Sequence, residues 1–445
     1  MLIAGEASGD TLAAEMVRAL RQEMGEAGAT PTLDYQPLHT SLEPRFFGAG
    51  GPRMAAEGVD LALDMTVHSV VGLTEVFRNL LKFRRQFQQL FRLALQRQPD
   101  AVICVDFSGF NRRFGHAVKQ YVRSHSDWFH DWNPKLIQYV SPQVWASRES
   151  RANKMALDYD LVLSIFPFEK EWYAKRVPQL PVEFVGHPIV DRYGDRRGLN
   201  ATPVDLIGPG AKGLLSPALF SKGGEGATTQ TTDRSLNSAL MGARTEGRGE
   251  KRTPLVLSLP GSRPDELRRH LPVIMGALDL IRAKLPDIRA RMVLPNESLI
   301  KQAKALGLPA GLDGRAGGLP ESLAEASIAI ASTGTVTIEC AYFGVPTVAL
   351  YKTSWSTYQI ARRMVKVKYL AMPNLLAQEE IFPEFIQAAA APDNLARAAV
   401  ELLRDASLRA RIRAKLAEIV ASLGGPGAAR RAAKAILETL GAKAS

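Results

Sequence analysis

The chain has 445 residues, of which 46% are hydrophobic and 23% are charged, and its formal net charge is +11. This length predicts two or three folded domains, and the balanced composition excludes a fibrous or wholly disordered protein. The positive charge favours polyanionic partners, among which nucleic acid, an anionic bilayer and phosphorylated substrates stay open. Because the sequence has no zinc-finger spacing, aromatic-basic RNA motif or helix-turn-helix pattern, we expect no nucleic-acid partner.

The first part of the chain, residues 1–190, alternates short apolar runs with amphipathic stretches, which is typical of a parallel sheet covered by helices. The predicted strands are residues 2–4, 101–105, 136–140, 161–163 and 182–185. Residues 191–252 lose this periodicity and are rich in Gly, Ser, Thr and Ala from residue 200 onward, which predicts a flexible linker or insertion.

A second α/β pattern occupies residues 253–352, with predicted strands at 255–259, 292–294, 328–331 and 347–350. The remaining residues, 353–445, are rich in Ala, Leu and Arg at helical spacing. We therefore expect two α/β domains and a set of C-terminal helices that pack back on the body.

An amphipathic stretch precedes Pro99 and carries cations among its apolar residues. As a membrane or acyl-chain surface it would gain from apolar burial and from anionic headgroups. The alternative is that the apolar stripe packs the helix onto the sheet. The candidate patch consists of Val70, Val71, Leu73, Phe77 and Leu81 with Arg78, Lys82, Arg84 and Arg85.

The two cysteines and the N-terminal residues indicate the cellular compartment of the protein. Cys104 and Cys340 both lie in apolar runs, which favours reduced, buried thiols over a disulfide framework. The chain starts without the basic and apolar regions of a signal peptide, and no uninterrupted apolar run is long enough to span a bilayer. These features predict a cytoplasmic protein.

The most informative motif follows the strand at 328–331. Thr333, Gly334 and Thr335 open a predicted helix, whose first N–H groups and positive dipole end suit a diphosphate. Glu339 lies four residues after Thr335 on the same helical face, where its carboxylate can accept hydrogen bonds from ribose hydroxyls. The alternative interpretation is a Thr N-cap with a surface Glu.

A second loop belongs to the same predicted edge of the sheet. The strand at 255–259 ends in Gly261, Ser262 and Arg263, just before a helix that begins with Pro264. The Arg263 guanidinium can stabilise the charge that develops on a departing diphosphate, unless it merely pairs with Glu266. No acidic pair or His/Cys cluster with metal-ligand spacing accompanies these loops, so we expect no metal and no cofactor.

Several motifs together resemble the lipid-A-disaccharide synthase family of bacterial enzymes. The matching segments are Gly5 to Asp10, Gly51 to Met54, Asp106 with Phe110 and Asn111, Ser141 and Pro142 with Val144 and Trp145, Phe166 to Lys170, Gly186 to Pro188, Pro260 to Arg263, Gly334 and Thr335 with Glu339, and Pro373 to Leu376. Only the insertion and the far C-terminus fall outside the resemblance.

The resemblance implies a GT-B fold, in which two Rossmann-like domains face a cleft. It implies that the second domain binds the UDP-sugar donor, with Asn374 added to its site, and that the first binds the acceptor. The implied substrates are UDP-2,3-diacylglucosamine and 2,3-diacylglucosamine 1-phosphate (lipid X), joined with inversion to the lipid A disaccharide 1-phosphate and UDP. It further implies a location on the cytoplasmic face of the inner membrane and a homodimer that exchanges C-terminal segments.

Inversion requires a base near the acceptor hydroxyl. Asp106, at the end of the strand at 101–105, is the first candidate, and Glu6 and Asp10 are the second. The alternative for Asp106 is to cap the following helix. Two rival functions stay open on this fold: a UDP-sugar 2-epimerase and a noncatalytic lipid-binding membrane protein. A second basic group is either a site for the acceptor phosphate or a solvated helix face; it consists of Arg362, Arg363, Lys366 and Lys368.

Overall fold

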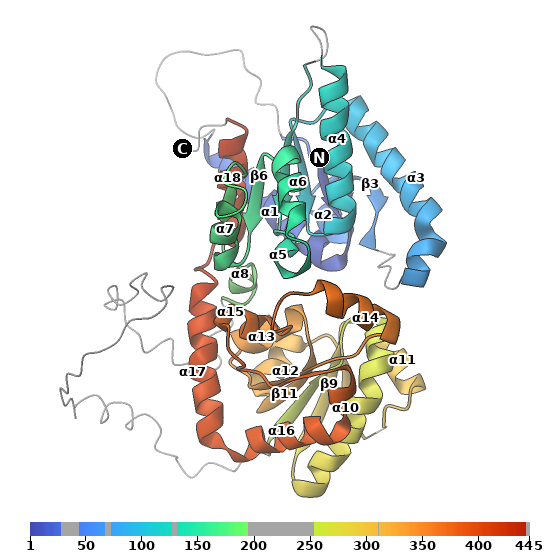
Figure 1. Cartoon of the computed structure of the whole chain (residues 1–445), viewed down its shortest axis with the longest axis vertical. Helices are drawn as coiled ribbons and strands as arrows, with labels where there is room; N and C mark the ends of the chain where they lie inside the picture. Colours follow the sequence, from blue (N-terminus) through green and yellow to red (C-terminus); the bar gives the residue numbers. More distant parts are fainter. Residues whose placement is uncertain (28–43, 67–72, 127–130, 195–252, 310, 442–445) are drawn as a thin grey trace, which may run out of the picture.

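The computed structural model describes residues 1–27, 44–66, 73–126, 131–194, 253–309 and 311–441. Within these residues the chain forms two parallel sheets, each covered by helices, and the two units lie one above the other along the long axis (Figure 1). The side chains of the first turns of α3, through Lys82, also lie outside the described part.

The first sheet has the strand order β3-β2-β1-β4-β5-β6-β7, with every pairing parallel. Its strands are β1 (Leu2–Ala4), β2 (Phe47–Gly50), β3 (Asp60–Asp64), β4 (Ala101–Val105), β5 (Lys135–Tyr139), β6 (Leu161–Ser164) and β7 (Val182–Phe184). The strand order reverses between β1 and β4. In open α/β sheets the crevice at such a switch point is where ligands bind.

Helices cover both faces of this sheet because the central strands are apolar along their whole length, as in β4, where all five residues are buried. The helices are α1 (Ala7–Ala27), α2 (Pro52–Ala56), α3 (Leu73–Arg97), α4 (Ser108–His125), α5 (Val144–Ser147), α6 (Ser150–Asp158), α7 (Pro167–Ala174) and α8 (Ile189–Tyr193). Phe87 and Phe91 of α3 form ring contacts with Phe114 of α4. The second half of α3 is thus fixed by aromatic packing.

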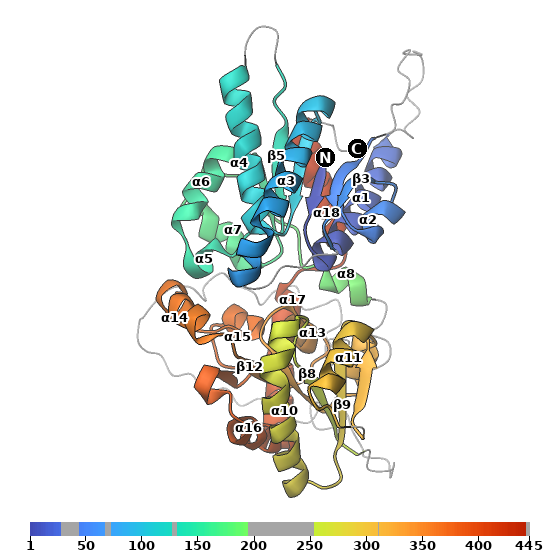
Figure 2. The ribbon, with the colours of Figure 1, turned by 90° about the vertical axis from the view of Figure 1, so that its right-hand side faces the viewer.

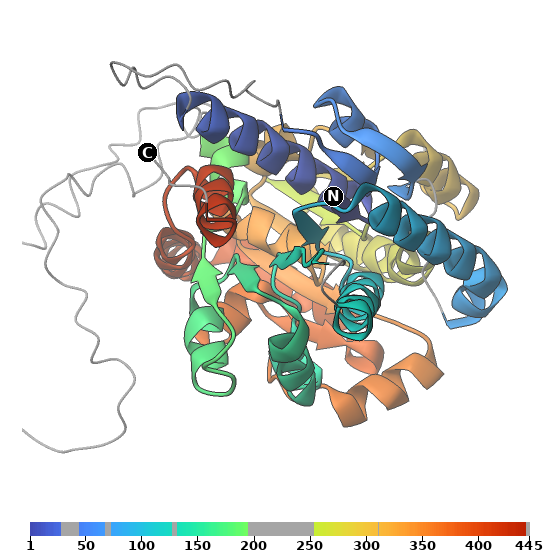
Figure 3. The same ribbon diagram turned by 90° about the horizontal axis from the view of Figure 1, so that it is seen from above.

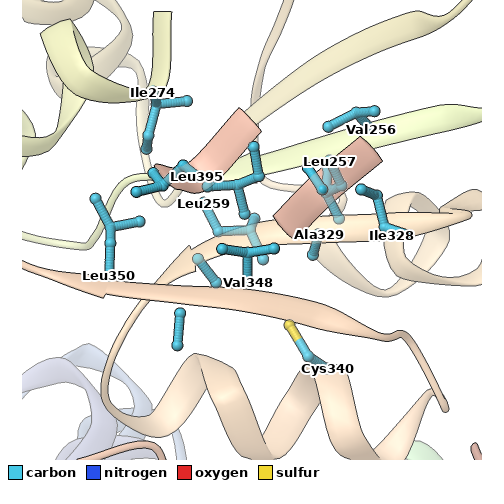
Figure 4. Packing of buried hydrophobic residues seen from close by; sticks show 14 of the residues in the cluster. Val256, Leu257, Leu259, Ile274, Ile328, Ala329, Cys340, Val348, Leu350 and Leu395 are labelled. Carbon is cyan, nitrogen blue, oxygen red and sulfur yellow. The ribbon is translucent and has the colours of Figure 1, made fainter. Parts of the chain in front are cut away.

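The second sheet has the order β10-β9-β8-β11-β12-β13 and is also parallel throughout. Its strands are β8 (Leu255–Leu259), β9 (Arg289–Leu294), β10 (Asp313–Ala316), β11 (Ile328–Ser332), β12 (Thr347–Tyr351) and β13 (Glu384–Ile386). Its order reverses between β8 and β11. Figure 4 shows the core beneath it, where Leu257, Val348 and Leu350 meet Ile274 and Leu395 from the helices.

The helices of the second unit are α10 (Pro264–Lys284), α11 (Glu297–Ala305), α12 (Leu319–Glu325), α13 (Thr335–Tyr342), α14 (Trp355–Met364), α15 (Met372–Ala377) and α16 (Pro392–Arg404). Long α17 (Ala406–Ser422) then carries the chain back, and α18 (Ala428–Thr439) packs against α1 of the first domain (Figures 2 and 3). The predicted α/β class with two parallel-sheet domains and returning C-terminal helices is confirmed.

The strands missed from the sequence are β2, β3, β10 and β13. β2 reads Phe-Gly-Ala-Gly and β3 is a partly exposed edge strand, so neither shows a continuous apolar run. Since β13 pairs with β12, the second sheet extends beyond residue 352, where the sequence placed the end of that domain. Both cysteines are free and buried, as predicted, and burial raises the pKa of each thiol to about 12.

Candidate active site

The loops that follow the two switch points meet in the cleft between the domains. In the first domain, Ala4 of β1 pairs with Val105 of β4, which places Glu6 and Asp106 next to each other at the carboxyl edge of the sheet. In the second domain, Leu259 of β8 pairs with Ala331 of β11. The Gly261–Arg263 loop and the Gly334 turn therefore lie side by side.

The backbone at Asp106 is held in an unusual conformation. Asp106 and Phe107 have φ values of 49° and 43°, a left-handed region that non-glycine residues seldom occupy. The Asp106 N–H donates to the Tyr139 carbonyl at 2.9 Å, and the Asp106 carbonyl accepts from buried Asn111 Nδ2 at 2.9 Å. A Cβ on Gly5 would lie 2.3 Å from the Phe107 ring, so this turn also requires a glycine at position 5.

The electrostatic surroundings suit Asp106 to accept a proton. Burial raises the pKa of its carboxyl group, and the neighbouring Glu6 carboxylate raises it further. A hydrogen bond from the backbone of Phe107 and the charge of Arg263 act in the opposite direction. A carboxylate whose pKa is raised toward the working pH is a better general base than an ordinary surface aspartate.

Arg263 connects the two domains. Its Nη2 atom lies 3.8 Å from Glu6 Oε2 across the cleft, and its Nη1 atom lies 3.4 Å from Glu266 Oε1 on its own helix. The pairing with Glu266 considered from the sequence therefore exists beside the cross-domain contact. Gly261 has φ 121°, and a Cβ there would lie 2.4 Å from the Glu266 carboxylate, so the close turn depends on glycine.

The start of α13 is open toward solvent. Gly334 has φ 130° and ψ −157°, a conformation limited to glycine, and beyond its chain neighbours no atom of the described residues lies within 4 Å of where its Cβ would be. Gly334 and Thr335 are exposed and Thr333 is half-buried. An anion can approach the first N–H groups of α13 here, and the position of the diphosphate stays a prediction.

Glu339 lies one turn along α13, and its Oε1 atom accepts a hydrogen bond from the Tyr193 hydroxyl of the first domain at 2.9 Å. Burial raises the pKa of Glu339, while the Tyr193 hydrogen bond lowers it. Tyr193 belongs to α8, at the end of the first domain, and was not singled out from the sequence. No local pattern distinguishes it from a core tyrosine, because the contact exists only once the domains are docked.

Two predicted site residues have structural partners instead. Asp10 is 2% exposed, and its carboxylate accepts from the backbone N–H groups of Gly51, Arg53 and Met54 at 2.8, 3.0 and 3.0 Å, which caps α2. Asn374 is fully buried, and its amide bonds Ile381, Phe382 and Glu384. Both side chains therefore support the loops around them, and their roles toward the reactants stay predictions.

His270 of α10 is a supporting residue that sequence reasoning missed. Its ring is fully buried, with Nδ1 2.6 Å from the Pro260 carbonyl and Nε2 accepting from the Lys352 N–H at 2.9 Å. Burial lowers the pKa of His270, so it stays neutral and can make both contacts. It joins the residue after β8, Pro260, to the residue after β12, Lys352.

The predicted membrane patch is only partly visible. Val70 and Val71 lie outside the described residues, as do the side chains of Leu73, Phe77, Arg78, Leu81 and Lys82, whereas Arg84 and Arg85 are exposed on α3. Among the helices that the structure describes, none is long and apolar enough to cross a bilayer.

Comparison with solved structures defines the class. The chain resembles the UDP-GlcNAc 2-epimerase from Neisseria meningitidis bound to UDP-GlcNAc, with a TM-score of 0.52, 10% identity and 98% of both chains covered. It also resembles the glycotransferase of kitacinnamycin, with a TM-score of 0.51, 16% identity and 98% of both chains covered. At these identities the likeness concerns the fold alone. The two parallel-sheet domains and these likenesses together define the fold as GT-B.

The sequence comparisons identify the family. The protein-family model described as lipid-A-disaccharide synthetase matches residues 1–207 and 242–439 of this chain. The chain is 31% identical over 452 residues to the lipid-A-disaccharide synthase of Alkalilimnicola ehrlichii, covering 100% of this chain and 99% of that relative. It is 32% identical over 453 residues to that of Geobacter metallireducens, with 100% and 97% covered. The chain belongs to the lipid-A-disaccharide synthetase family, and it is a glycosyltransferase of lipid A biosynthesis.

Proposed function

We propose that the enzyme transfers diacylglucosamine from UDP-2,3-diacylglucosamine to the 6-hydroxyl of 2,3-diacylglucosamine 1-phosphate, with inversion at the anomeric carbon. The observation that carries this proposal is the meeting of Asp106 and Glu6 of the first domain with Arg263 of the second. The Arg263 guanidinium lies 3.8 Å from Glu6 and electrostatically affects the Asp106 carboxyl group. These contacts support a reaction in which a base from one domain acts opposite a permanent cation from the other.

In the proposed reaction, the acceptor oxygen attacks C1 of the donor while its proton moves to the Asp106 carboxylate. The bond from C1 to the β-phosphate oxygen breaks, and the electron pair leaves with UDP. Arg263 and the first N–H groups of α13 stabilise the charge that grows on the diphosphate. Glu339 binds the ribose, and the Tyr193 hydrogen bond holds its side chain in place.

Product analysis tests this function. The purified enzyme is incubated with UDP-diacylglucosamine, with and without the monosaccharide 1-phosphate, each with and without EDTA. A disaccharide 1-phosphate that forms only when acceptor is added supports the transferase, and full activity in EDTA supports the expected independence of metal. Conversion of the donor to an isomer without acceptor would favour the 2-epimerase, and absence of any turnover would favour a noncatalytic protein.

We further propose that the enzyme is a peripheral protein of an anionic membrane surface on the cytoplasmic side. Support comes from α14, a ten-residue helix with no buried residue. Trp355 is 75% exposed and Ile360 is 51% exposed. Arg362 and Arg363 lie in the last turn of the helix and are also exposed. Apolar side chains beside cations are what an anionic interface binds.

Vesicle sedimentation distinguishes the two membrane candidates. On vesicles with anionic lipid, Trp355→Asp with Ile360→Asp is expected to reduce the bound fraction if α14 contributes, and Phe77→Asp with Leu81→Asp if the start of α3 does. Ser356→Asp, an exposed change on α14 that removes no apolar side chain, is the control for added negative charge. Unchanged binding of both double variants would refute the membrane surface.

The homodimer is a separate proposal. In this structure α18 packs on α1 of its own chain, and a dimer that exchanges C-terminal segments would place the same contact between two chains. A mass from light or X-ray scattering of twice 48.5 kDa supports the dimer, and a mass of 48.5 kDa refutes it.

A further inference from the structure

A cavity of about 370 Å³ lies between the domains, beside the proposed reaction centre. One wall comes from the first domain, where Ser108 stands two residues after Asp106 and the α5 segment follows. The other wall comes from residues 365–375 of the second domain. The two walls are joined where the Lys366 N–H donates to the Ala146 carbonyl at 2.8 Å. Its volume falls in the usual range for small-molecule sites, about 300–1,000 Å³.

The charged side chains that line this cavity are all arginines among the described residues. Arg112, Arg148 and Arg151 contribute to it, and no carboxylate lines it among the described residues. No ion pair joins any of the three arginines to an acidic group in the described part of the chain. Glu149, which lies between them in sequence, pairs with Arg176 and Lys366 instead, at 3.6 and 3.7 Å. The arginine charges therefore remain available to an anion.

One carboxyl group near the cavity, that of Glu169, does not neutralise the arginine charges. Glu169 is fully buried and accepts a hydrogen bond from Trp145 Nε1 at 2.9 Å, and Trp145 lines the cavity. Burial raises the pKa of Glu169 to about 8, so the group is mostly neutral at pH 7. The start of α4, whose first residue Ser108 lines the cavity, adds the positive end of an 18-residue helix.

The rest of the lining is largely apolar. Val144 and Trp145 from the first domain face Val365, Val367 and Leu375 from the second. A ligand that matches both parts has an anionic head and an apolar body. A phosphate monoester is the anion for which arginine forks are best suited, because each guanidinium can bond two of its oxygens.

We infer that this cavity binds the phosphate monoester of the acylated sugar acceptor, with Arg112 and Arg151 on the phosphate and the apolar walls against the start of the acyl chains. The inference rests on the proposed function and adds to it the place and orientation of the acceptor. The phosphate lies at the arginines, and the hydroxyl at the far end of the sugar reaches Asp106. The basic group Arg362, Arg363, Lys366 and Lys368 is not part of the lining.

The test compares two acceptors that differ only in the phosphate, in neutral detergent micelles so that no anionic headgroup competes. Arg112→Gln and Arg151→Gln are each expected to raise the KM for the phosphorylated acceptor by about ten- to a hundred-fold, the loss typical of one charge-assisted contact. The donor KM and the kcat/KM for the unphosphorylated acceptor should stay unchanged. Arg113→Gln is the matched control, since Arg113 is exposed on α4 and does not line the cavity.

Equal losses with both acceptors, or no loss with either, would overturn the inference. A direct binding measurement tests this site separately from the reaction. The phosphorylated monosaccharide is titrated into wild type and variants, with Trp fluorescence as the readout. Weaker binding in Arg112→Gln but not in Arg113→Gln supports the site even if no disaccharide forms, which would refute only the proposed function. Equal binding in wild type and all three variants refutes the site even if the wild type is active.

Discussion

Replacing Asp10 separates a structural role from a catalytic one. Its carboxylate is 2% exposed and accepts three backbone N–H groups at the start of α2. In Asp10→Ala these donors lose their partner, and those of Gly51 and Met54 are buried. At about 1–3 kcal/mol for each buried donor left unpaired, with water replacing part of the loss, we expect about 3 kcal/mol of destabilisation.

Asp10→Asn should cost less, about 1 kcal/mol. Asn Oδ1 can still accept from Gly51 and Met54, which both bond Oδ1 of the aspartate, whereas the new amide faces the Arg53 N–H that bonded Oδ2. The control is Asp60→Ala, which removes an exposed ion pair with Arg97 of 2.6 Å. Such pairs contribute about 0–1 kcal/mol.

Calorimetric melting and steady-state kinetics together distinguish a structural from a catalytic role of Asp10. For a domain of this size, about 2–4 °C are lost per kcal/mol, so Asp10→Ala should lower the Tm by about 6–12 °C and Asp60→Ala by at most about 4 °C. The kcat per folded molecule should stay within about three-fold in Asp10→Ala, because a lost general base costs about 10²–10⁴-fold. An unchanged Tm with a kcat a hundred-fold lower would refute this reasoning and return Asp10 to the list of bases.

Three further predictions concern single carboxyl groups. Asp106→Asn should lower kcat about 10²–10⁴-fold and abolish the acid limb of the pH–rate profile, because activity rises as the carboxyl group loses its proton; an intact limb would assign the base elsewhere. Glu339→Ala should raise the donor KM far more than it lowers kcat, and the reverse pattern in initial-rate kinetics would move Glu339 from binding to chemistry. Glu169→Gln, if it keeps the Trp145 hydrogen bond, should raise the Tm in thermal melts by several degrees at pH 8.5 and by less at pH 5. An increase in Tm that is the same at both pH values would contradict this prediction.

The sign of the Glu169 prediction follows from proton binding. The folded protein holds this proton up to about pH 8, whereas the unfolded chain releases it near the ordinary glutamate pKa of 4.5. Between these values the folded state binds more protons, so stability falls as pH rises and is fully present only below pH 4.5. The neutral glutamine has no such dependence. The control is Glu57→Gln, which makes the same substitution of an amide for a carboxylate at a partly exposed position.

Elements with a strong local signal were predicted correctly. The strands β4, β8, β11 and β12 are buried along all or nearly all of their length and are mostly apolar, and α10 begins at a proline after a glycine-containing turn. Weak elements were missed: β2 is half glycine, β10 is mostly exposed, and β13 has only three residues. Such strands exist because a neighbouring strand offers free hydrogen-bonding groups, which no local pattern records.

The sequence alone determined two α/β units, the glycine turns at Gly261 and Gly334, and the family motifs that contain Asp106, Arg263 and Glu339. It could determine these because strand periodicity, helix starts and glycine turns are local properties of the chain. Only the tertiary structure decided which polar groups remain available for chemistry. Asp10 and Asn374 carry the right side chains but bond groups of the surrounding fold, whereas Arg112 and Arg151 belong to no recognised motif and line a cavity that has no carboxylate among the described residues. Burial and pairing depend on segments far apart in the chain, and residue types do not encode them locally.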